Sequence, residues 1–501
     1  MKQIFASGIV MSLLSTAAMA QVQPFTGFTR QDLKDDFKYA VTLLKQQHPN
    51  PYKFTDTVTF NRKMDSLMNR LDKDPSLLSA LRYSPVQLFN DVHLKLDYDE
   101  ERVIDVFYGI NHFPLAITTF KDRIIVNAKG ETIPFGAEIL SINKMPAAKL
   151  LSEIGYATYS DGFIRTGADR TGTNLGLFIS LIFPEATSYE VVYKAYGAKN
   201  PATVQLQAVD AKTGYHNRSL GELPFNTFLK RAYVTKEYLD KESTAILTVL
   251  TFMLQENAMY KELSDFFAEV KKRNISNVII DIRSNGGGNP NMSALLYSFV
   301  ALHPFDNVFN YRTKNIEMHD PQHLLNGYGA KMEETEVKQT GDFLKQRFDY
   351  DSASGFYYGN ARLTEGSISN YPPDKNNFKG NVYVLISGGT VSAATYFAAL
   401  VKNNKRGVLI GAETGSGEAS TTAAWFNTYM LPKTKSRLTV PMSEVYFMKA
   451  KQDNGRGCVP DKELTFDAFQ QYIHAGKDPE IQYTLDMIRG KLAEPGAKTT
   501  L

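Results

Sequence analysis

Three consecutive glycines end an apolar segment in the middle of the chain, within the stretch Asp281-Ile282-Arg283-Ser284-Asn285-Gly286-Gly287-Gly288. Glycine allows backbone conformations closed to other residues and lets another group approach closely. The N–H groups of Gly286 or Gly287 can therefore point at a ligand oxygen, as an oxyanion hole requires. The alternatives are a flexible turn or a phosphate loop. The stretch lacks the lysine of GxxxxGK[ST] and the spacing of GxGxxG, which disfavours a nucleotide site.

A serine lies at a second glycine turn, just beyond another apolar segment. Val382 to Ile386 is followed by Gly388-Gly389, and a helix is predicted to begin at about Ser392. A helix N-terminus presents free N–H groups and a partial positive charge, which favour an attacking oxygen. The N–H of Ala393 would be a further oxyanion donor. The alternative is that Ser392 only caps the helix, because serine is a preferred cap residue.

The two motifs together resemble the C-terminal-processing (tail-specific) serine peptidase family, which includes the tricorn-type core. Members carry a D-x-R-x-N-G-G-G strand end and a later S-A-A helix start, here Asp281 to Gly288 and Ser392 to Ala394. Further similar segments follow in the family's order: Ile410-Gly411-Ala412-Glu413-Thr414, Leu431-Pro432, Val440-Pro441 and Gly457-Cys458-Val459-Pro460-Asp461. In the N-terminal helical region, Asp91-Val92-His93 resembles the D-G-H of the family's histidine-bearing branch. The resemblance implies an α/β fold with a crotonase/ClpP-like core and a PDZ-like domain before it.

The resemblance also implies a serine-type endopeptidase that works through an acyl-enzyme, with Ser392 as nucleophile. The lysine-using branch places its base at about Gly417 of this chain, so a Ser–Lys pair is disfavoured. His93, in a segment resembling the D-G-H of the histidine-bearing branch, is then the expected base, since neutral imidazole accepts a proton near pH 7. The family's frequent acid after S-A-A is replaced by Thr395.

The third member of the catalytic group stays open. The tricorn-type branch orients its histidine through a hydroxyl and a distant glutamate. Glu444 and Asp453, the latter beside Asn454, are the candidates in this chain.

The elements that must position these residues follow from the apolar pattern. Residues 21–106 are predicted to be helical, with a helix over 29–48 capped by Thr29 and Asp32. A β-rich, PDZ-like domain is predicted over 107–210, an α/β peptidase core over 211–475, and a helix or tail over 476–501. A third N-terminal helix is expected from about Ser84 toward Asn90. The polar stretch from His319 to Lys379 is expected to be a long loop or insertion.

The N-terminus and composition point to an exported protein. Lys2, the apolar run from Ile4 to Leu14, and Ala18-Met19-Ala20 fit a signal peptide over residues 1–20 that is cleaved after about Ala20. We therefore expect a periplasmic or secreted protein without stable membrane insertion. One cysteine excludes a disulfide within the chain, and no metal or organic cofactor is expected. A net charge of +3 without a basic run disfavours nucleic acid as a partner.

Peptide or protein substrates are the expected partners, and the oligomeric state is left open. The main alternative is a catalytically inactive, peptide-binding member of the same fold. A crotonase-like enzyme acting on thioesters would use similar backbone donors, but its acyl carriers are mostly cytoplasmic. An exported glycan-binding protein is favoured by the compartment alone.

Overall fold

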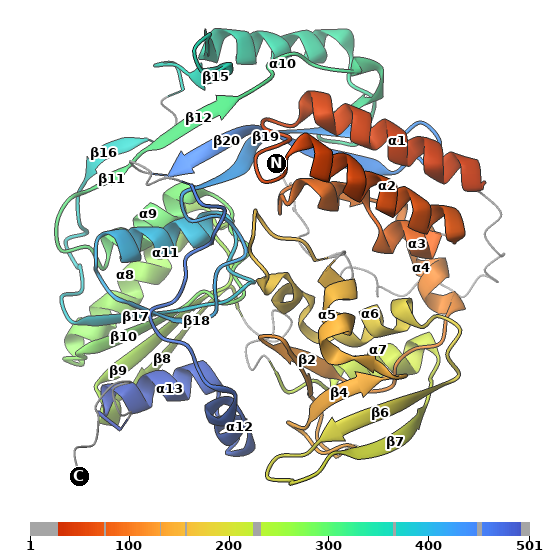
Figure 1. The fold of residues 1–501 in the computed structure, drawn as a ribbon. Helices are drawn as coiled ribbons and strands as arrows, with labels where there is room; N and C mark the ends of the chain where they lie inside the picture. Colours follow the sequence, from red (N-terminus) through yellow and green to blue (C-terminus); the bar gives the residue numbers. More distant parts are fainter. Residues whose placement is uncertain are drawn as a thin grey trace. The chain divides into compact units, whose positions relative to one another are not determined.

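The computed structural model describes residues 29–491 except 75–76, 131, 156–157, 224–231, 364–366 and 448–452. The predicted signal peptide lies outside these residues. The chain forms two compact units, each assembled from separate segments. Unit 1 consists of Met1–Asn111, Phe309–Glu365 and Ser420–Ala450; unit 2 consists of His112–Val308, Gly366–Ala419 and Lys451–Leu501. Figure 1 shows the mixed α/β character of the fold.

The N-terminal part of unit 1 is helical, as predicted. Thr29 and Asp32 form a reciprocal capping box at the first helix, and the N–H of His48 closes its last turn on Leu44 O. The expected third helix is instead a short 3-10 turn, because Pro85 starts it and Asn90 leaves it in a left-handed conformation. The helical elements are α1 (Arg30–Gln47), α2 (Thr57–Lys73), α3 (Leu77–Arg82), η1 (Pro85–Phe89), α4 (Glu100–Gly109), η4 (Pro321–His323) and α10 (Glu334–Arg347).

A seven-stranded antiparallel sheet completes unit 1. Its order is β13-β19-β20-β12-β15-β14, and β1 also pairs with β20. The long hairpin of β19 and β20 forms its centre, and a bulge interrupts their register between Ala423 and Phe426. The strands are β1 (Lys95–Asp97), β12 (Phe309–Thr313), β13 (Leu324–Leu325), β14 (Phe348–Asp351), β15 (Phe356–Gly359), β19 (Ser420–Met430) and β20 (Arg437–Phe447).

The prediction of a long loop from His319 to Lys379 is wrong. This stretch contains α10 and several strands, and a capping box between Glu333 and Glu336 starts the helix. Some of its apolar residues lie in one small cluster, where Leu344 and Phe348 are buried and Trp425 packs against them. The many polar residues between these apolar positions hid the elements in the sequence.

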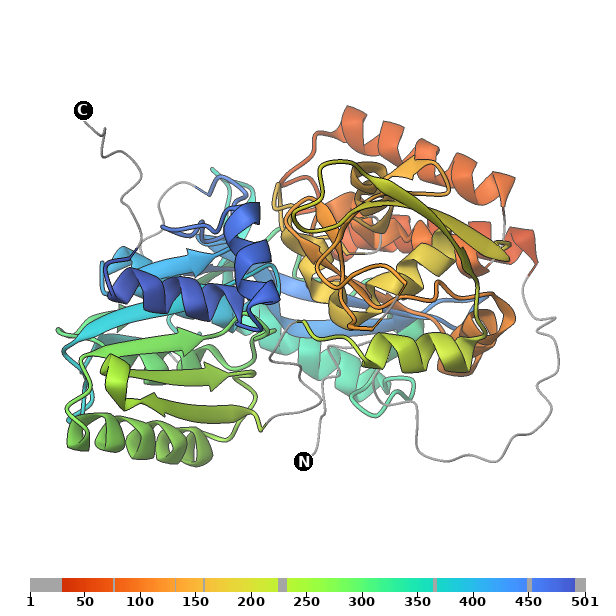
Figure 2. The ribbon, with the colours of Figure 1, turned by 90° about the horizontal axis from the view of Figure 1, so that it is seen from below.

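The centre of unit 2 is a five-stranded sheet of order β18-β17-β10-β9-β8, parallel except for β8. The strands predicted around Val278, Val382 and Val408 are confirmed, and every residue of β10 is buried. Figure 2 shows α13 lying across β17 and β18. The elements are β8 (Val234–Leu239), η3 (Asp240–Glu242), β9 (Thr244–Val249), α8 (Glu256–Lys272), β10 (Asn277–Asp281), α9 (Pro290–Ser298), β17 (Asn381–Ile386), α11 (Ala393–Asn403), β18 (Val408–Gly411), α12 (Phe466–His474) and α13 (Pro479–Ile488).

A second, antiparallel sheet of unit 2 occupies the segment predicted to be β-rich. Its order is β2-β3-β4-β6-β7, with β5 paired to β4. A separate two-stranded antiparallel sheet is formed by β11 (Phe305–Asn307) and β16 (Ile368–Tyr371). The elements of the second sheet and its helices are β2 (Ile117–Phe120), β3 (Arg123–Val126), β4 (Glu138–Ile142), β5 (Met145–Pro146), α5 (Ala147–Gly155), η2 (Thr166–Asn174), α6 (Leu175–Ile182), β6 (Ser188–Lys194), β7 (Ala202–Gln207) and α7 (Ala211–Ser219).

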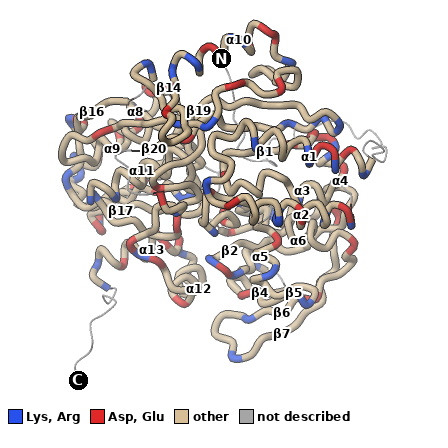
Figure 3. The backbone as a smooth tube through the Cα atoms, turned by 45° about the horizontal axis from the view of Figure 1, so that its top comes forward, with Lys and Arg blue, Asp and Glu red and all other residues tan. Residues whose placement is uncertain are grey.

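Acidic and basic residues are interspersed along both units (Figure 3). Within the described ranges, no helix has both the length and the apolar character that crossing a bilayer requires.

Candidate active site

Ser392 lies at a sharp turn between strand β17 and helix α11. Its backbone has φ 58° and ψ −122°, a left-handed conformation that costs a non-glycine residue on the order of 1–3 kcal/mol. It occupies the N-cap position, yet its side chain makes no capping hydrogen bond, and α11 begins one residue later, at Ala393. The capping role considered from the sequence therefore does not account for this serine. A strained turn of this kind holds a nucleophilic hydroxyl out from a strand–helix junction.

The triple-glycine loop lies directly against this turn. A Cβ added to Gly287 would be 2.8 Å from Ser392 Cβ and 3.1 Å from the nitrogen of Ala393. The N–H of Val391 donates to Asn285 O over 3.0 Å, so main-chain hydrogen bonding joins the two loops. The two motifs, about a hundred residues apart in sequence, thus converge at Ser392.

The three predicted oxyanion donors differ in their hydrogen bonding. The N–H of Gly287 donates to Asn285 Oδ1 over 2.9 Å and is therefore engaged. Gly286 is exposed, and a Cβ added to it would meet open space. In the part of the chain that the structure describes, the N–H groups of Gly286 and Ala393 have no hydrogen-bond partner. These two N–H groups can donate to a ligand oxygen without first breaking a hydrogen bond.

Around Gly417, where the lysine-using branch has its base, the described contacts are made by main-chain groups, hydroxyls and one carboxylate. The N–H of Gly417 donates to Asp161 Oδ2 over 3.0 Å. The preceding residue, Ser416, accepts the N–H of Ser392 over 2.7 Å. Thr395, which replaces the family's acid, donates its hydroxyl to Thr390 O. No lysine takes part in these contacts.

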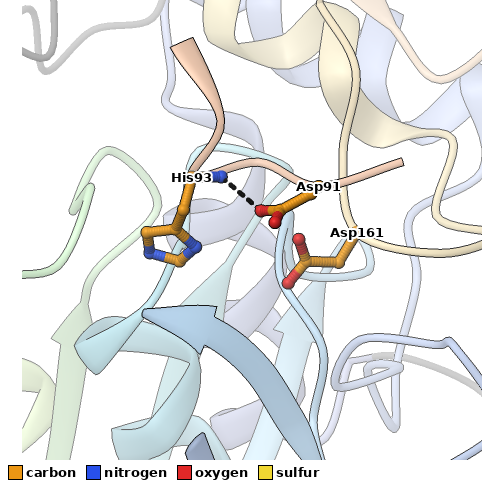
Figure 4. Close-up of side chains that lie close together, drawn as sticks. All are labelled: Asp91, His93 and Asp161. Atoms are coloured by element: carbon orange, nitrogen blue, oxygen red, sulfur yellow. Dashed lines mark hydrogen bonds between the residues drawn. The ribbon is translucent and has the colours of Figure 1, made fainter. Parts of the chain in front are cut away.

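His93 belongs to unit 1 and is held there by Asp91. The main-chain N–H of His93 donates to Asp91 Oδ1 over 2.8 Å (Figure 4). An imidazole nitrogen of His93 lies within 4.8 Å of an oxygen of the Asp91 carboxylate. Thr421 Oγ1, on β19, lies 3.2 Å from His93 Nδ1. A carboxylate and a hydroxyl within one unit therefore fix the main chain and one ring nitrogen of His93.

Asp91 is itself buried in a network of hydrogen bonds. His48 Nε2 lies 2.8 Å from Asp91 Oδ2, and Thr422 donates its hydroxyl to the same oxygen. Because the N–H of Asn50 donates to His48 Nδ1, the proton of neutral His48 is on Nε2, facing Asp91. Burial alone would raise the pKa of Asp91, but the hydrogen bonds from His48 and Thr422 and the nearby His93 outweigh burial and lower the pKa. Asp91 therefore carries its charge at neutral pH.

Neither sequence candidate for the third group shows a polar contact with His93 among the described interactions. Glu444 is fully buried in unit 1, where Oε1 pairs with Lys53 Nζ at 2.9 Å and Oε2 with Arg312 Nε at 2.6 Å. Asp453 belongs to unit 2 and accepts the N–H of Gly455. The groups that do contact His93 are Asp91, present in the D-V-H motif without an assigned role, and Thr421, for which the sequence holds no local signal.

Comparison with known proteins identifies the segment that carries Ser392. Residues 243–464 match the model of peptidase family S41. A search of curated proteins finds no match. Solved structures with a similar fold include mature CPAF, at 16% identity and a TM-score of 0.56, covering 92% of this chain and 97% of that one. The structure of CPAF complexed with lactacystin has 15% identity and a TM-score of 0.54, covering 92% of this chain and 99% of that one.

The photosystem II D1 C-terminal processing protease is more distant, at 14% identity and a TM-score of 0.37, covering 87% of this chain and 94% of that one. The TM-scores to CPAF indicate a shared fold, and the segment matched by the family model includes both the triple-glycine loop and Ser392. Through residues 243–464, the chain is similar to peptidase family S41, the C-terminal-processing serine peptidases that its motifs resemble.

Proposed function

We propose that this protein is an exported serine endopeptidase that hydrolyses peptide bonds through an acyl-enzyme on Ser392. The observation that carries the proposal is the approach of the Gly287 backbone to Ser392 Cβ at a strained, uncapped turn. Such a turn costs free energy, and strained residues of this kind concentrate at functional sites. Attack by Ser392 Oγ on a carbonyl carbon would place the developing negative charge beside two unengaged N–H groups.

Those two groups, on Ala393 and Gly286, are the oxyanion donors in this proposal. Each preorganised donor is worth on the order of 3–4 kcal/mol of transition-state stabilisation. Gly287 contributes by its missing side chain, because any Cβ there would collide with the serine turn. Its own N–H stays on Asn285 and shapes the loop.

His93 is the proposed base. The Thr421 hydroxyl engages Nδ1, which leaves Nε2 to take the serine proton and return it to the leaving amine. The charge of Asp91, within 4.8 Å of the ring, would stabilise the imidazolium formed in that step. Ser416, which contacts Ser392, and Thr421, which contacts His93, are five positions apart in the sequence.

Three parts of the proposal rest on the sequence. The antiparallel sheet of β2 to β7 is proposed to be a PDZ-like domain that binds a substrate's C-terminal end. The signal peptide proposed over residues 1–20 would direct the protein to the periplasm or outside the cell. The core around the five-stranded sheet is proposed to be of crotonase/ClpP type.

The test is the labelling of Ser392 by a fluorophosphonate probe, together with cleavage of unfolded protein. The mature chain is expected to be labelled once, at Ser392, and the Ser392→Ala variant is expected to lose both labelling and cleavage. A variant that still cleaves at the wild-type rate would refute the assignment. A wild-type chain that binds peptides but is neither labelled nor active would instead support the inactive member of the fold, which the glycine at position 417 favours.

A further inference from the structure

A chain of hydroxyl groups lies behind Ser392, inside unit 2. The N–H of Ser392 donates to Ser416 Oγ over 2.7 Å, and the Ser416 hydroxyl donates to Thr395 Oγ1 over 2.9 Å. Thr395 then donates to the carbonyl oxygen of Thr390 over 3.0 Å. Ser416, Thr395 and Thr390 are all fully buried.

The direction of this chain is fixed by its two ends. A backbone N–H can only donate and a carbonyl can only accept, so each hydroxyl hydrogen has one possible partner. Ser416 must therefore present a lone pair to the N–H of Ser392. The Gly415 N–H also donates to Thr390 O, which ties the loop carrying Ser416 to the turn before the helix.

We propose that Ser416 is a positioning residue for Ser392: its hydroxyl holds the main chain of the nucleophile in its strained conformation and withholds that N–H from the oxyanion. The inference rests on the proposed function. A non-glycine residue keeps a φ of 58° only where surrounding contacts stabilise that conformation. For Ser392, the hydrogen bond from its main-chain N–H to Ser416 Oγ is such a contact.

The same bond determines which groups face the substrate. The N–H of Ser392 is hydrogen-bonded to Ser416, and the N–H of Gly287 is hydrogen-bonded to Asn285. The N–H groups of Ala393 and Gly286 therefore remain as donors for the substrate. Losing the Ser416 hydroxyl would let the serine turn relax and would leave a buried N–H without an acceptor. Acylation would then slow, whereas substrate binding, made elsewhere, would change little.

Ser180 supplies a matched control. It is equally buried in unit 2, accepts the N–H of Phe113 over 2.9 Å, and donates to Gly176 O. Ser180→Ala therefore removes the same kind of backbone contact away from Ser392. Thr395→Val breaks the middle of the hydroxyl chain without changing its volume much, and Thr395→Ser keeps the hydroxyl.

The experiment measures fluorophosphonate labelling rates, kcat and KM on one peptide, and hydrogen exchange in a peptide spanning Ser392. Ser416→Ala is expected to lower the labelling rate and kcat about tenfold or more, with KM nearly unchanged. It is also expected to speed exchange at Ser392 about tenfold. The labelling rate and kcat of Thr395→Val should lie between those of wild type and Ser416→Ala, and those of Thr395→Ser should stay near wild type. Ser180→Ala should lose stability but keep the wild-type labelling rate and kcat.

Wild-type labelling in Ser416→Ala, or a loss no larger than that of Ser180→Ala, would overturn the inference. If the wild-type chain is not labelled at Ser392, the proposed function fails instead. Hydrogen exchange at Ser392 then still decides whether Ser416 holds this amide, because that measurement needs no activity.

Discussion

Replacing Gly287 with alanine tests whether the two loops converge as described. The added Cβ would lie 2.8 Å from Ser392 Cβ and 2.8 Å from Val391 O, closer than van der Waals contact allows. The residue also has φ 99°, which an L side chain rarely adopts. The backbone penalty is about 1–2 kcal/mol and the overpacking about 1–3 kcal/mol, so we expect a loss of about 2–5 kcal/mol in unfolding free energy.

Two other glycines separate these contributions. Gly197 has φ 74° with nothing within 4 Å of an added Cβ, so Gly197→Ala carries the backbone penalty alone. Gly286 has open space and no positive φ, so Gly286→Ala carries neither. The difference between Gly287→Ala and Gly197→Ala, measured by urea denaturation, is the contribution of the contact with the serine turn.

Fluorophosphonate labelling then connects this contact to activity. A clash that moves Ser392 by a sizeable fraction of an ångström is expected to lower its labelling rate by about a hundredfold. Gly197→Ala should label at the wild-type rate. If Gly287→Ala matches Gly197→Ala in both stability and labelling, the triple-glycine loop does not lie against Ser392 and the reasoning is refuted.

Three further predictions concern buried ionisable groups. The lowered pKa of Asp91 means that its contribution to stability is present at neutral pH and is lost as the pH falls through that pKa. Asp91→Asn should therefore be less stable than wild type at pH 7, with the gap closing only as the pH falls below about 4 in urea titrations; a gap that stays constant at lower pH would contradict this. Burial raises the pKa of Asp169 despite the hydrogen bonds from Gly388 N–H and Thr119, so its contribution declines as the pH rises. Asp169→Asn keeps the acceptor for Gly388, and its stability relative to wild type should increase as the pH rises above about 4, the ordinary pKa of an aspartate; a relative loss would count against the assignment. Burial also raises the pKa of the Cys458 thiol well above its usual value. A disulfide reagent should react with native protein far more slowly than with urea-unfolded protein, and stability should decline above about pH 8.5 in wild type but not in Cys458→Ala.

Local chemistry made much of unit 2 predictable from the sequence. The strands around Val278, Val382 and Val408 are continuous apolar runs, because a parallel sheet covered on both faces requires them. The glycine loop and the serine turn were recognisable because few residue types can adopt their backbone conformations. The helix cap at Thr29 likewise depends on residues three apart.

Contacts between distant segments were not predictable in the same way. Thr421 meets His93 across 328 positions of sequence, and which residue of β19 does so depends on strand register and a bulge. Glu444 was an open candidate for the third catalytic group, and no local signal in the sequence indicated its ion pairs with Lys53 and Arg312. The domain limits predicted along the sequence stay predictions, whereas each compact unit draws on three separate segments.

The weaving of the chain between the two units has a practical consequence for fragments. A piece comprising 243–464 would lack β1, which pairs with β20 from Lys95 to Asp97, and would lack the N-terminal helices of unit 1. Part of the β20 edge would then offer unpaired amides and carbonyls to other molecules, and such edges promote aggregation. The matched segment is thus not expected to fold by itself, and recombinant work should begin from the whole polypeptide.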